Sequence, residues 1–352
     1  THPLASTGNA AFYTRDCYDI CRQALNPGGI VSQWVPLHDI SSEDCKILLR
    51  TFLDVFPHAM LFLIYFPDNS YLIGSADPLP LSWRRLAAKM EDAQVRKDLS
   101  SVNITSPYAV WSLLALDTEG LRRYVGEGPV FTDNHPIVEF EGPLRKEERF
   151  GEILAEILSI RPPQLRVPDD TSGASIAFDS ARADSFYTAA THIMRGLLAA
   201  EQSRGDDHLR ELSSALALTP GDSAADYLYR QALRVKLIFE GSAASRRGAF
   251  DVTLANYERA LALDPRDPGQ VELLTTLGWI YCAVDVEKAQ QYLDRAIELA
   301  PNYARARTSL AEVYLRKGML DKARRELVVA ARLDPNDPAA RELMRQVGGQ
   351  KR

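Results

Sequence analysis

The stretch Phe12–Trp34, FYTRDCYDICRQALNPGGIVSQW, decides the fold of the first part of the chain. The run Asn26–Gly29 ends a predicted helix, because proline cannot continue a helix and glycine accepts a positive φ. Ile30–Trp34 is then predicted to be a buried strand of a parallel sheet. A helix that leads into a strand in this way is half of a βαβ unit, and no strand precedes it after Thr1. We therefore expect the chain to begin inside a domain. The helix is predicted because apolar side chains recur at steps of three and four residues, at Tyr13, Cys17, Ile20, Cys21 and Leu25.

A second helix is predicted directly after this strand. Ser41 or Ser42 can cap its first turn with a side-chain oxygen, and the apolar pattern continues to about Val55. The positions expected to face the core lie on one side of this helix, and they are Ile47, Leu48, Thr51, Phe52 and Val55.

Two further strands are predicted to form a hairpin. Ala59–Phe66 and Tyr71–Gly74 are apolar runs of strand length, and the turn sequence Pro-Asp-Asn-Ser separates them. We expect the strand Ile30–Trp34 to lie at the edge of the sheet beside the later hairpin strand. It contains no charged residue or proline that would protect an open edge.

The next hundred or so residues are predicted to be mostly helical up to a linker. Residues 161–182 have a linker composition and mark the expected domain boundary. The elements expected before the linker are helices at Ser82–Leu99 and Pro107–Leu116, a short helix capped by Asp117 and ending near Val125, a strand or extended segment at Ile137–Phe140, and a helix around Glu147–Ile160.

From about Ala189 the pattern changes to a helical repeat. The interval from Pro301 to Pro335 is thirty-four residues, which is the period of the tetratricopeptide repeat, a pair of packed helices. A last helix, Arg341–Val347, is expected to cover the apolar face of the final repeat. Arg230–Pro265 is expected to be a stretched second repeat with about eleven extra residues. Tyr314 and Ala323, in the last full repeat, are expected to be buried. The last two repeats correspond position by position: Leu277-Gly278, Tyr281, Ala289, Leu293, Ala296 and Pro301 match Leu310-Ala311, Tyr314, Ala323, Leu327, Ala330 and Pro335.

Composition indicates a globular chain and excludes few functions. The 352 residues are 46% hydrophobic and 25% charged, and no apolar run is long enough for a membrane span. Residues 1–188 have 17 basic and 25 acidic side chains, which argues against a nucleic-acid surface there. Four cysteines without a paired framework favour free thiols in a reducing, cytoplasmic location. Cys17 and Cys21 lie one helical turn apart, but two ligands do not make a zinc site.

Three blocks of the first part resemble one enzyme family in content and in order. They are HPLASTGNAAFYTRDCYDICRQALNPGGIVSQWVPLHDI, FPHAMLFLIYFPDNSYLIGS and TDNHPIVEFEGP, and the resemblance that they mark extends over residues 1–143. This part resembles the second half of a spermidine synthase-like domain, a polyamine aminopropyltransferase of the bacterial type that is fused to other modules. The resemblance implies a class I methyltransferase-like, Rossmann-like fold. It also implies transfer of an aminopropyl group from decarboxylated S-adenosylmethionine to a diamine.

The resemblance transfers few site residues to this chain. Gln33 matches a glutamine that the family places beside the amine pocket, and the loop Ser6, Thr7 and Gly8 matches the loop that covers the pocket. His2 stands where the family has the second aspartate of an Asp-Ser-Ser-Asp-Pro-like motif, and the first would precede Thr1. Gln33 is equally well explained as a strand-end amide that serves backbone groups, and Ser6–Gly8 as an ordinary loop. The catalytic residues stay unknown.

Two weaker candidates follow from position in the sequence. His38 comes after the strand that carries Gln33, and a surface histidine is the alternative. The block Thr132–Pro136, with Glu139, resembles one that closes the domain in the fused proteins, and a turn before a strand is the alternative.

The expected architecture is an α/β partial class I methyltransferase-like domain followed by an all-α tetratricopeptide solenoid. We expect the transferase-like domain at 1–143, a helix and linker at 144–188, and the repeats at 189–352. No glycine-rich loop follows a predicted strand, so no cofactor is expected in this chain, and we expect the chain alone to be inactive.

Two classes of function remain open. One is an aminopropyltransferase fragment without its cofactor-binding half, coupled to a module that binds a peptide or protein on the tetratricopeptide groove. The other is a non-catalytic scaffold that carries a degenerate transferase domain. Several fused relatives have membrane-spanning segments ahead of the catalytic domain, so the resemblance leaves a membrane-tethered parent open.

Overall fold

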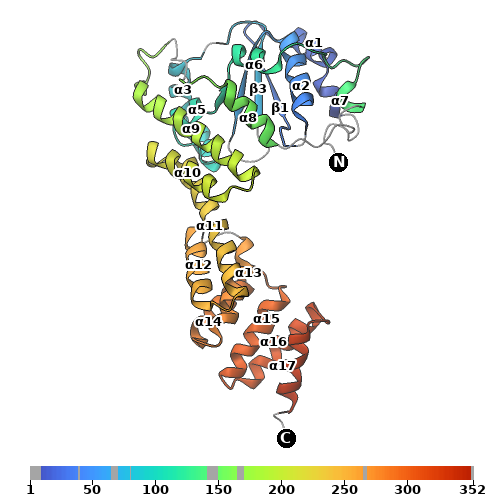
Figure 1. Cartoon of the computed structure of the whole chain (residues 1–352), viewed down its shortest axis with the longest axis vertical. Helices are drawn as coiled ribbons and strands as arrows, with labels where there is room; N and C mark the ends of the chain where they lie inside the picture. Colours follow the sequence, from blue (N-terminus) through green and yellow to red (C-terminus); the bar gives the residue numbers. More distant parts are fainter. Residues whose placement is uncertain are drawn as a thin grey trace. The chain divides into compact units, whose positions relative to one another are not determined.

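The computed structural model describes residues 9–38, 40–64, 70–79, 81–140, 150–164, 170–264 and 268–349. The chain forms two compact units, Thr1–Tyr229 and Arg230–Arg352 (Figure 1). The division falls inside helix α11 (Ser223–Arg246), whereas the sequence placed its boundaries at 143 and 188. The domain ranges expected from the sequence stay predictions, and each unit is described below by itself.

The stretch that decides the fold forms the predicted helix and strand, but the predicted burial is wrong for most of the strand, where only Val35 is buried, and for Ile20 of the helix, which is exposed. After a short 3-10 helix, η1 (Asn9–Tyr13), come α1 (Arg15–Ala24) and β1 (Val31–Val35). The side-chain oxygen of Thr14 accepts the backbone N–H of Cys17 at 3.2 Å and so caps α1. Gly28, in the turn between the two elements, has φ of +70°, a conformation that glycine adopts without strain.

One four-stranded sheet lies in the first unit. Its strands β1, β2 (His58–Leu63), β3 (Ser70–Ser75) and β4 (Leu114–Leu116) follow the order β1-β3-β2-β4, and every neighbouring pair is antiparallel. The parallel pairing predicted for this sheet is therefore wrong, because the hairpin strand β3 turns back and inserts between β1 and β2, although β3 is the neighbour that was predicted for β1. The edge position predicted for β1 is confirmed within the described residues. Since both β1 and β2 are antiparallel to β3, they run in the same direction.

Helix α2 (Ser42–Val55) packs its predicted face on this sheet. Ser41 caps it by accepting the backbone N–H of Asp44 at 3.0 Å, and the five predicted core positions are all buried. A Cβ atom on Gly74 of β3 would lie only 2.2 Å from Cε1 of Phe52. Glycine at this position therefore lets the helix and the sheet approach closely. Tyr18 of α1 sets its ring edge-on to Phe52 with centroids 5.0 Å apart.

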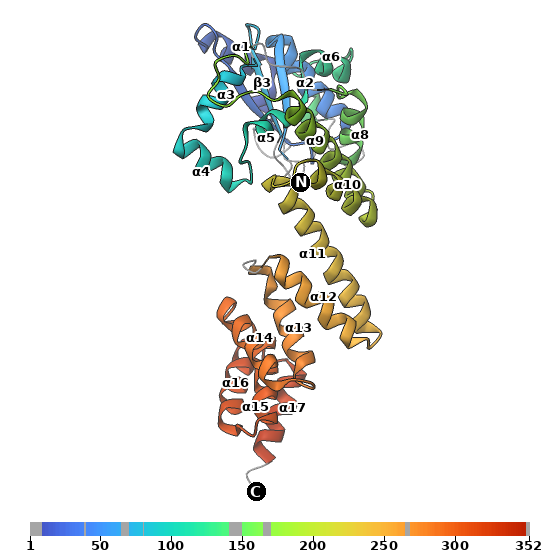
Figure 2. The ribbon, with the colours of Figure 1, turned by 90° about the vertical axis from the view of Figure 1, so that its left-hand side faces the viewer.

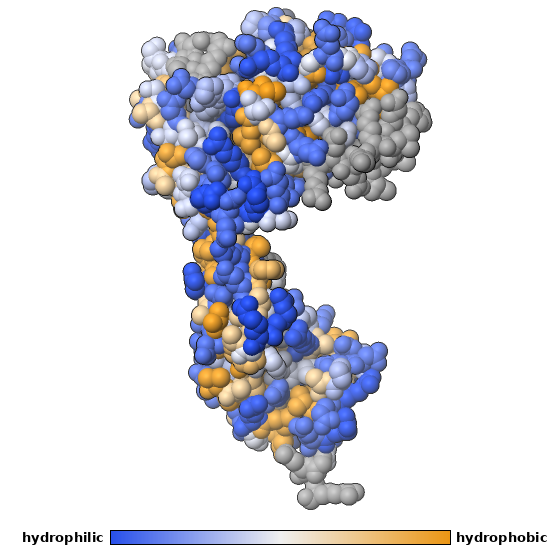
Figure 3. Space-filling model, viewed as in Figure 1, coloured by the Kyte–Doolittle hydropathy of each residue, from blue (hydrophilic) through white to orange (hydrophobic). Residues whose placement is uncertain are grey.

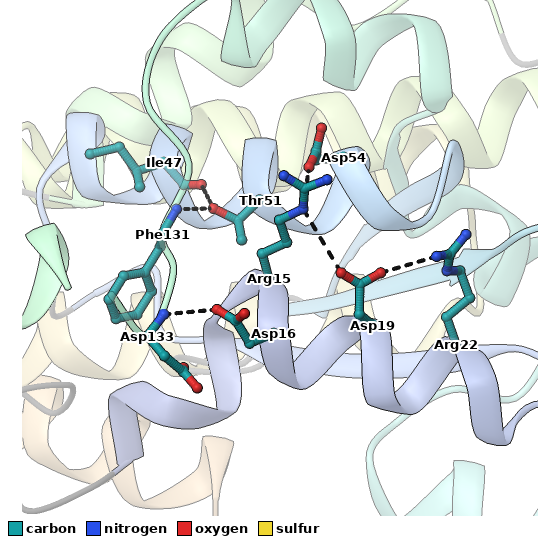
Figure 4. A network of polar contacts seen from close by, with 9 residues as sticks. All are labelled: Arg15, Asp16, Asp19, Arg22, Ile47, Thr51, Asp54, Phe131 and Asp133. Carbon is teal, nitrogen blue, oxygen red and sulfur yellow. Dashed lines mark hydrogen bonds and ion pairs between the residues drawn. The ribbon is translucent and has the colours of Figure 1, made fainter. Parts of the chain in front are cut away.

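Polar contacts fasten α1 to α2 and to the segment around Phe131 (Figure 4). The Arg15 guanidinium lies 3.0 Å from the carboxylate of Asp54. Two further contacts join residues that lie far apart in the sequence: the Asp16 carboxylate accepts the N–H of Asp133 at 2.9 Å, and the Thr51 hydroxyl accepts the N–H of Phe131 at 2.8 Å.

The helices that follow differ from the prediction at three places. The single helix expected at Ser82–Leu99 is two helices, α3 (Trp83–Met90) and α4 (Ala93–Ser101), because the Asp92 carboxylate accepts the N–H of Gln94 at 2.8 Å and starts a new helix. The helix expected at Pro107–Leu116 stops at Ser112, since Leu114–Leu116 pairs with β2 as β4. Ile137–Phe140 is one turn of helix (α7) instead of a strand. The other elements are α5 (Pro107–Ser112), α6 (Thr118–Val125), with the predicted Asp117 cap, and α8 (Phe150–Ile160).

The described part of the predicted linker packs on the first unit. Trp83 Nε1 donates to the carbonyl of Ile176 at 2.7 Å, and the Tyr108 hydroxyl donates to the carbonyl of Ala177 at 3.0 Å. Phe178 sets its ring edge-on to Trp83, with centroids 5.0 Å apart. Helices α9 (Ser180–Glu201) and α10 (Gly205–Leu218) follow and pack on each other, and α9 also packs on α5 and α8.

The second unit consists of paired helices, as the repeat predicts (Figure 2). The long α11 accounts for the extra residues expected in the second repeat. Ala323 is fully buried as predicted, but Tyr314 is only half-buried, so that part of the prediction is wrong. The remaining elements are α12 (Phe250–Leu263), η3 (Pro268–Gln270), α13 (Val271–Tyr281), α14 (Val286–Leu299), α15 (Ala304–Arg316), α16 (Leu320–Leu333) and the terminal helix α17 (Pro338–Gly349). Across the described ranges, no helix is both long and apolar enough to cross a membrane.

Candidate functional site

The sequence-predicted amine pocket is described only at Gln33. Its side-chain amide donates to the carbonyl of Trp34 at 3.1 Å, and the Tyr13 hydroxyl donates to the same carbonyl at 3.0 Å. Burial raises the pKa of Tyr13, and its hydrogen bond with Gln33 opposes part of that rise. Gln33 thus serves a backbone group of the edge strand, which is the alternative that the sequence left open. His2, Ser6, Thr7 and Gly8 lie outside the described residues, so a substrate site built from these five residues stays a prediction.

The structure also describes the surroundings of the two weaker candidates, His38 and the block Thr132–Pro136. His38 is half-buried and its ring lies 4.0 Å from that of Phe150, centroid to centroid. Thr132 and His135 exchange backbone hydrogen bonds, so the block forms a turn, and a helix instead of a strand follows it. The side chain of Glu139 is not among those described. Within the described ranges, no group of three or more His, Cys, Asp or Glu side chains is placed to hold a metal ion, and the four cysteines are free thiols.

A groove of about 430 Å³ lies in the second unit. Helices α13 and α15 and the start of α17 line it, together with the connection between α16 and α17. Its lining includes Trp279 from α13, Arg305 and Glu312 from α15, and Asp334, Asp337 and Leu343 from the last connection and α17.

The aromatic wall of the groove follows from the repeat pattern. Gly278 faces α14, where a Cβ atom would lie 2.4 Å from Cγ of Leu293. The next residue along α13, Trp279, therefore points away from that interface, and 48% of it is exposed. Its ring is held edge-on by Phe250 of α12, with centroids 6.3 Å apart and planes at 75°. In the space-filling view, apolar surface is also exposed along α11 and α12 (Figure 3).

The polar wall carries three carboxylates and one guanidinium. The Asp337 carboxylate accepts the hydroxyl of Thr308 at 2.8 Å and the N–H of Ala339 at 2.9 Å, which fixes the first turn of α17 on α15. The Glu312 carboxylate lies 3.4 Å from the guanidinium of Arg316. The Asp334 carboxylate accepts the N–H of Asn336 at 2.9 Å.

The guanidinium that lines the groove belongs to Arg305, and it already lies beside a carboxylate. Arg305 lies 4.0 Å from the carboxylate of Glu272, and both side chains are well exposed. The groove therefore combines a half-exposed indole with a surplus of negative charge. Sequence analysis predicted a groove in the repeats but none of these residues. The signal was present, because a tryptophan follows the small residue that marks the helix-pair contact.

Comparison with known proteins identifies the repeats. The family model for the tetratricopeptide repeat matches residues 283–347, so this part of the chain contains tetratricopeptide repeats. The chain is 33% identical over 90 residues to a TPR repeat-containing thioredoxin, TTL4, of Arabidopsis thaliana, a match that covers 26% of this chain and 13% of that protein. It is 36% identical over 86 residues to a polyamine aminopropyltransferase of Nitrosomonas europaea, which covers 23% of this chain and 26% of that protein. The matches thus span about an eighth and a quarter of these two relatives.

Solved structures of repeat proteins are similar at low identity. The first TPR domain of Spaghetti (RPAP3), bound to an HSP90 peptide, is 19% identical with a TM-score of 0.31, and the match covers 33% of this chain and 91% of that one. YrrB, a TPR protein with an unusual peptide-binding site, is 16% identical with a TM-score of 0.29, and the match covers 56% of this chain and 82% of that one.

Proposed function

We propose that the second unit binds a segment of a partner protein in the groove lined by α13, α15 and α17. The observation that carries this proposal is the half-exposed Trp279 at a groove within tetratricopeptide repeats. Tryptophan is enriched among the residues that dominate binding energy at protein interfaces. Each repeat buries its apolar face on its neighbours, so a large aromatic ring left at a groove is available to a partner.

Panning a phage-displayed library of random dodecapeptides on the full chain tests this proposal. We expect recovered peptides to bind the wild-type chain and to lose affinity about tenfold or more with Trp279→Ala. Leu299→Ala is the matched control, since Leu299 is exposed to a similar extent, 44%, but does not line the groove. Peptides that bind equally well to the Trp279→Ala chain would place the binding surface elsewhere.

A second proposal concerns the first unit, which we infer to be related to the spermidine synthase-like aminopropyltransferases. The 36% identity to a polyamine aminopropyltransferase supports it. So does the succession of β1, α2, β2 and β3, in which β1 and β2 run in the same direction. The implied co-substrate is decarboxylated S-adenosylmethionine and the implied acceptor is a diamine. A non-catalytic scaffold that carries such a domain fits the same observations.

The described carboxylates that follow strands have structural partners. Asp77, after β3, accepts the N–H of Gly28 at 3.1 Å, and Asp117, after β4, accepts the N–H of Gly120 at 2.8 Å. A carboxylate that deprotonates an amine has to face that amine. We therefore propose that this chain alone is inactive. Incubated with decarboxylated S-adenosylmethionine and putrescine, it should form no methylthioadenosine above a protein-free control, and turnover of about 1 per second would contradict the proposal.

A further inference from the structure

We propose that the partner segment held in this groove is basic and carries an apolar side chain. Its apolar side chain would pack on the indole of Trp279, and its lysine or arginine side chains would face the carboxylates of Glu312, Asp334 and Asp337. This inference rests on the proposed peptide-binding function and adds the chemistry of the partner to it.

Charge on the lining residues supplies the first argument. Three carboxylates and one guanidinium line the groove. Arg305 is already 4.0 Å from Glu272, and Glu312 is 3.4 Å from Arg316, so the carboxylates of Asp334 and Asp337 carry the net negative charge of the lining. The acidic lining is local, because residues 230–352 as a whole contain 21 Lys and Arg against 16 Asp and Glu. A positively charged segment therefore finds its complement at the groove in particular, instead of on the surface at large.

The capacity of the carboxylates supplies the second argument. An ionised carboxylate has about four acceptor sites on its two oxygens. Asp337 uses one site on each oxygen, for Thr308 and Ala339, and Asp334 uses one for Asn336. Each can therefore accept a further charge-assisted hydrogen bond from a lysine or arginine without giving up the contacts that fix α17.

An acidic segment is disfavoured at the same place. Its carboxylates would approach three like charges, and like-charge contacts are a common way in which interfaces reject wrong partners. The hydroxyl of Thr308, which also lines the groove, already donates to Asp337 and is therefore not available as a donor to an incoming carboxylate. The groove thus selects by repulsion as well as by attraction.

The charge of peptides recovered by panning tests the inference. A random dodecapeptide library is panned on the full chain, and binders that depend on Trp279 are sequenced. We expect these binders to be enriched in Lys and Arg together with an aromatic or aliphatic residue, and to bind less tightly as salt is raised. Glu312→Lys should weaken them about tenfold, and the charge-removing Glu312→Gln should weaken them less. Glu298→Lys, the same change at an exposed position of α14 outside the groove, should leave binding unchanged.

The outcomes separate this inference from the proposed function. Trp279-dependent binders that are acidic or neutral would overturn the basic partner and leave peptide binding standing. A library that yields no Trp279-dependent binders would overturn both. If the wild-type chain self-associates and Glu312→Lys abolishes it, the occupant is a second copy, and the inference is also overturned. Circular dichroism melts of the variants establish that each is folded, and Glu312→Gln keeps the shape of the side chain should Glu312→Lys fail that check.

Discussion

One carboxylate joins three helices of the second unit. Oε1 of Glu258, on α12, accepts hydrogen bonds from Tyr281 of α13 at 2.6 Å and from Lys288 and Tyr292 of α14 at 2.5 and 3.0 Å. The Lys288 ammonium also lies 4.3 Å from the ring centroid of Tyr281. Burial raises the pKa of Glu258, but the three hydrogen bonds outweigh burial and leave the pKa below its ordinary value. The charged form of this side chain therefore stabilises the fold.

Replacing this carboxylate should lower stability in a pH-dependent way. A carboxyl whose pKa is lowered in the folded state contributes stability above its ordinary pKa, near 4.5, and loses it as pH falls through the folded value. We expect Glu258→Gln to cost about 1–2 kcal/mol near neutral pH, the lower part of that range being favoured because a third of the side chain is exposed. Urea unfolding at about pH 7 and about pH 3 measures the free energy of unfolding of the variant and the wild type at each pH. The difference between the two proteins should shrink in acid. Glu298→Gln, at an exposed position of α14, should change stability by less than about 0.5 kcal/mol at either pH.

The close approach of α13 and α14 should tolerate no side chain at Gly278. A Cβ atom there would lie 2.4 Å from Cγ of the buried Leu293. We expect Gly278→Ala to destabilise the second unit by about 1–3 kcal/mol through overpacking, although alanine is the better helix former. At Gly205, the first residue of α10, a Cβ atom meets nothing within 4 Å. Gly205→Ala should therefore be neutral or slightly stabilising, and equal thermal shifts for the two variants would contradict the packing argument.

Sequence reasoning at the residue scale succeeded where a position is set by local geometry. Gly278, Ala323 and the caps Ser41 and Asp117 were identified from spacing, because each one meets a requirement of its own helix or helix pair. Tyr314 was expected to be buried, but it packs at the margin of the core with Lys322 over its ring at 5.4 Å. A tyrosine hydroxyl can keep its contact with water while its ring packs, and the repeat period does not reveal how far the ring is covered.

At the scale of elements, the sequence predicts which segments are strands better than it predicts their partners. The two hairpin strands and β1 lie where the apolar runs placed them. The later hairpin strand was correctly predicted as the neighbour of β1, but the antiparallel direction of that pair and the short β4 were missed, because pairing depends on contacts between segments far apart in the chain. Leu114–Leu116 was assigned to a helix for the same reason, since only its pairing with β2 identifies it as a strand.

The edge position of β1 should promote self-association. Within the described residues β1 pairs only with β3, and Ser32 on it is exposed. An open, uncharged edge strand can pair with another chain, and a charge on it opposes that pairing. We expect the full chain to associate with rising concentration in sedimentation experiments and Ser32→Lys to weaken the association about tenfold, equivalent to about 1.4 kcal/mol. Ser101→Lys, at the exposed end of α4, adds the same charge elsewhere and should have no effect. A wild-type chain that stays monomeric throughout would refute the prediction.

At the scale of the whole molecule, the sequence located the repeats, while the packed units divide the chain at another place, between Tyr229 and Arg230. The period begins at about residue 189, yet α9 and α10 pack within the first unit, and Met194 belongs to the core that contains the sheet residues. A helical repeat pattern indicates which faces of a segment are apolar, but it does not indicate which neighbouring element covers them. The first helix of the pattern, α9, therefore packs on α5 and α8, elements that carry no repeat signature.

This difference changes which fragment should fold alone. A fragment of residues 223–352 begins where α11 begins and contains all the helices of the second unit. Because each repeat packs mainly on its neighbours, we expect a cooperative thermal transition followed by circular dichroism. A fragment of residues 189–352 starts inside α9 and removes the partners that Met194 has in the core of the first unit. It should melt no higher than the shorter fragment and should aggregate more readily, because an uncovered apolar face favours association. If the longer fragment is instead monomeric and melts well above the shorter one, α9 and α10 stabilise the repeats directly, and the unit that folds begins where the sequence placed it.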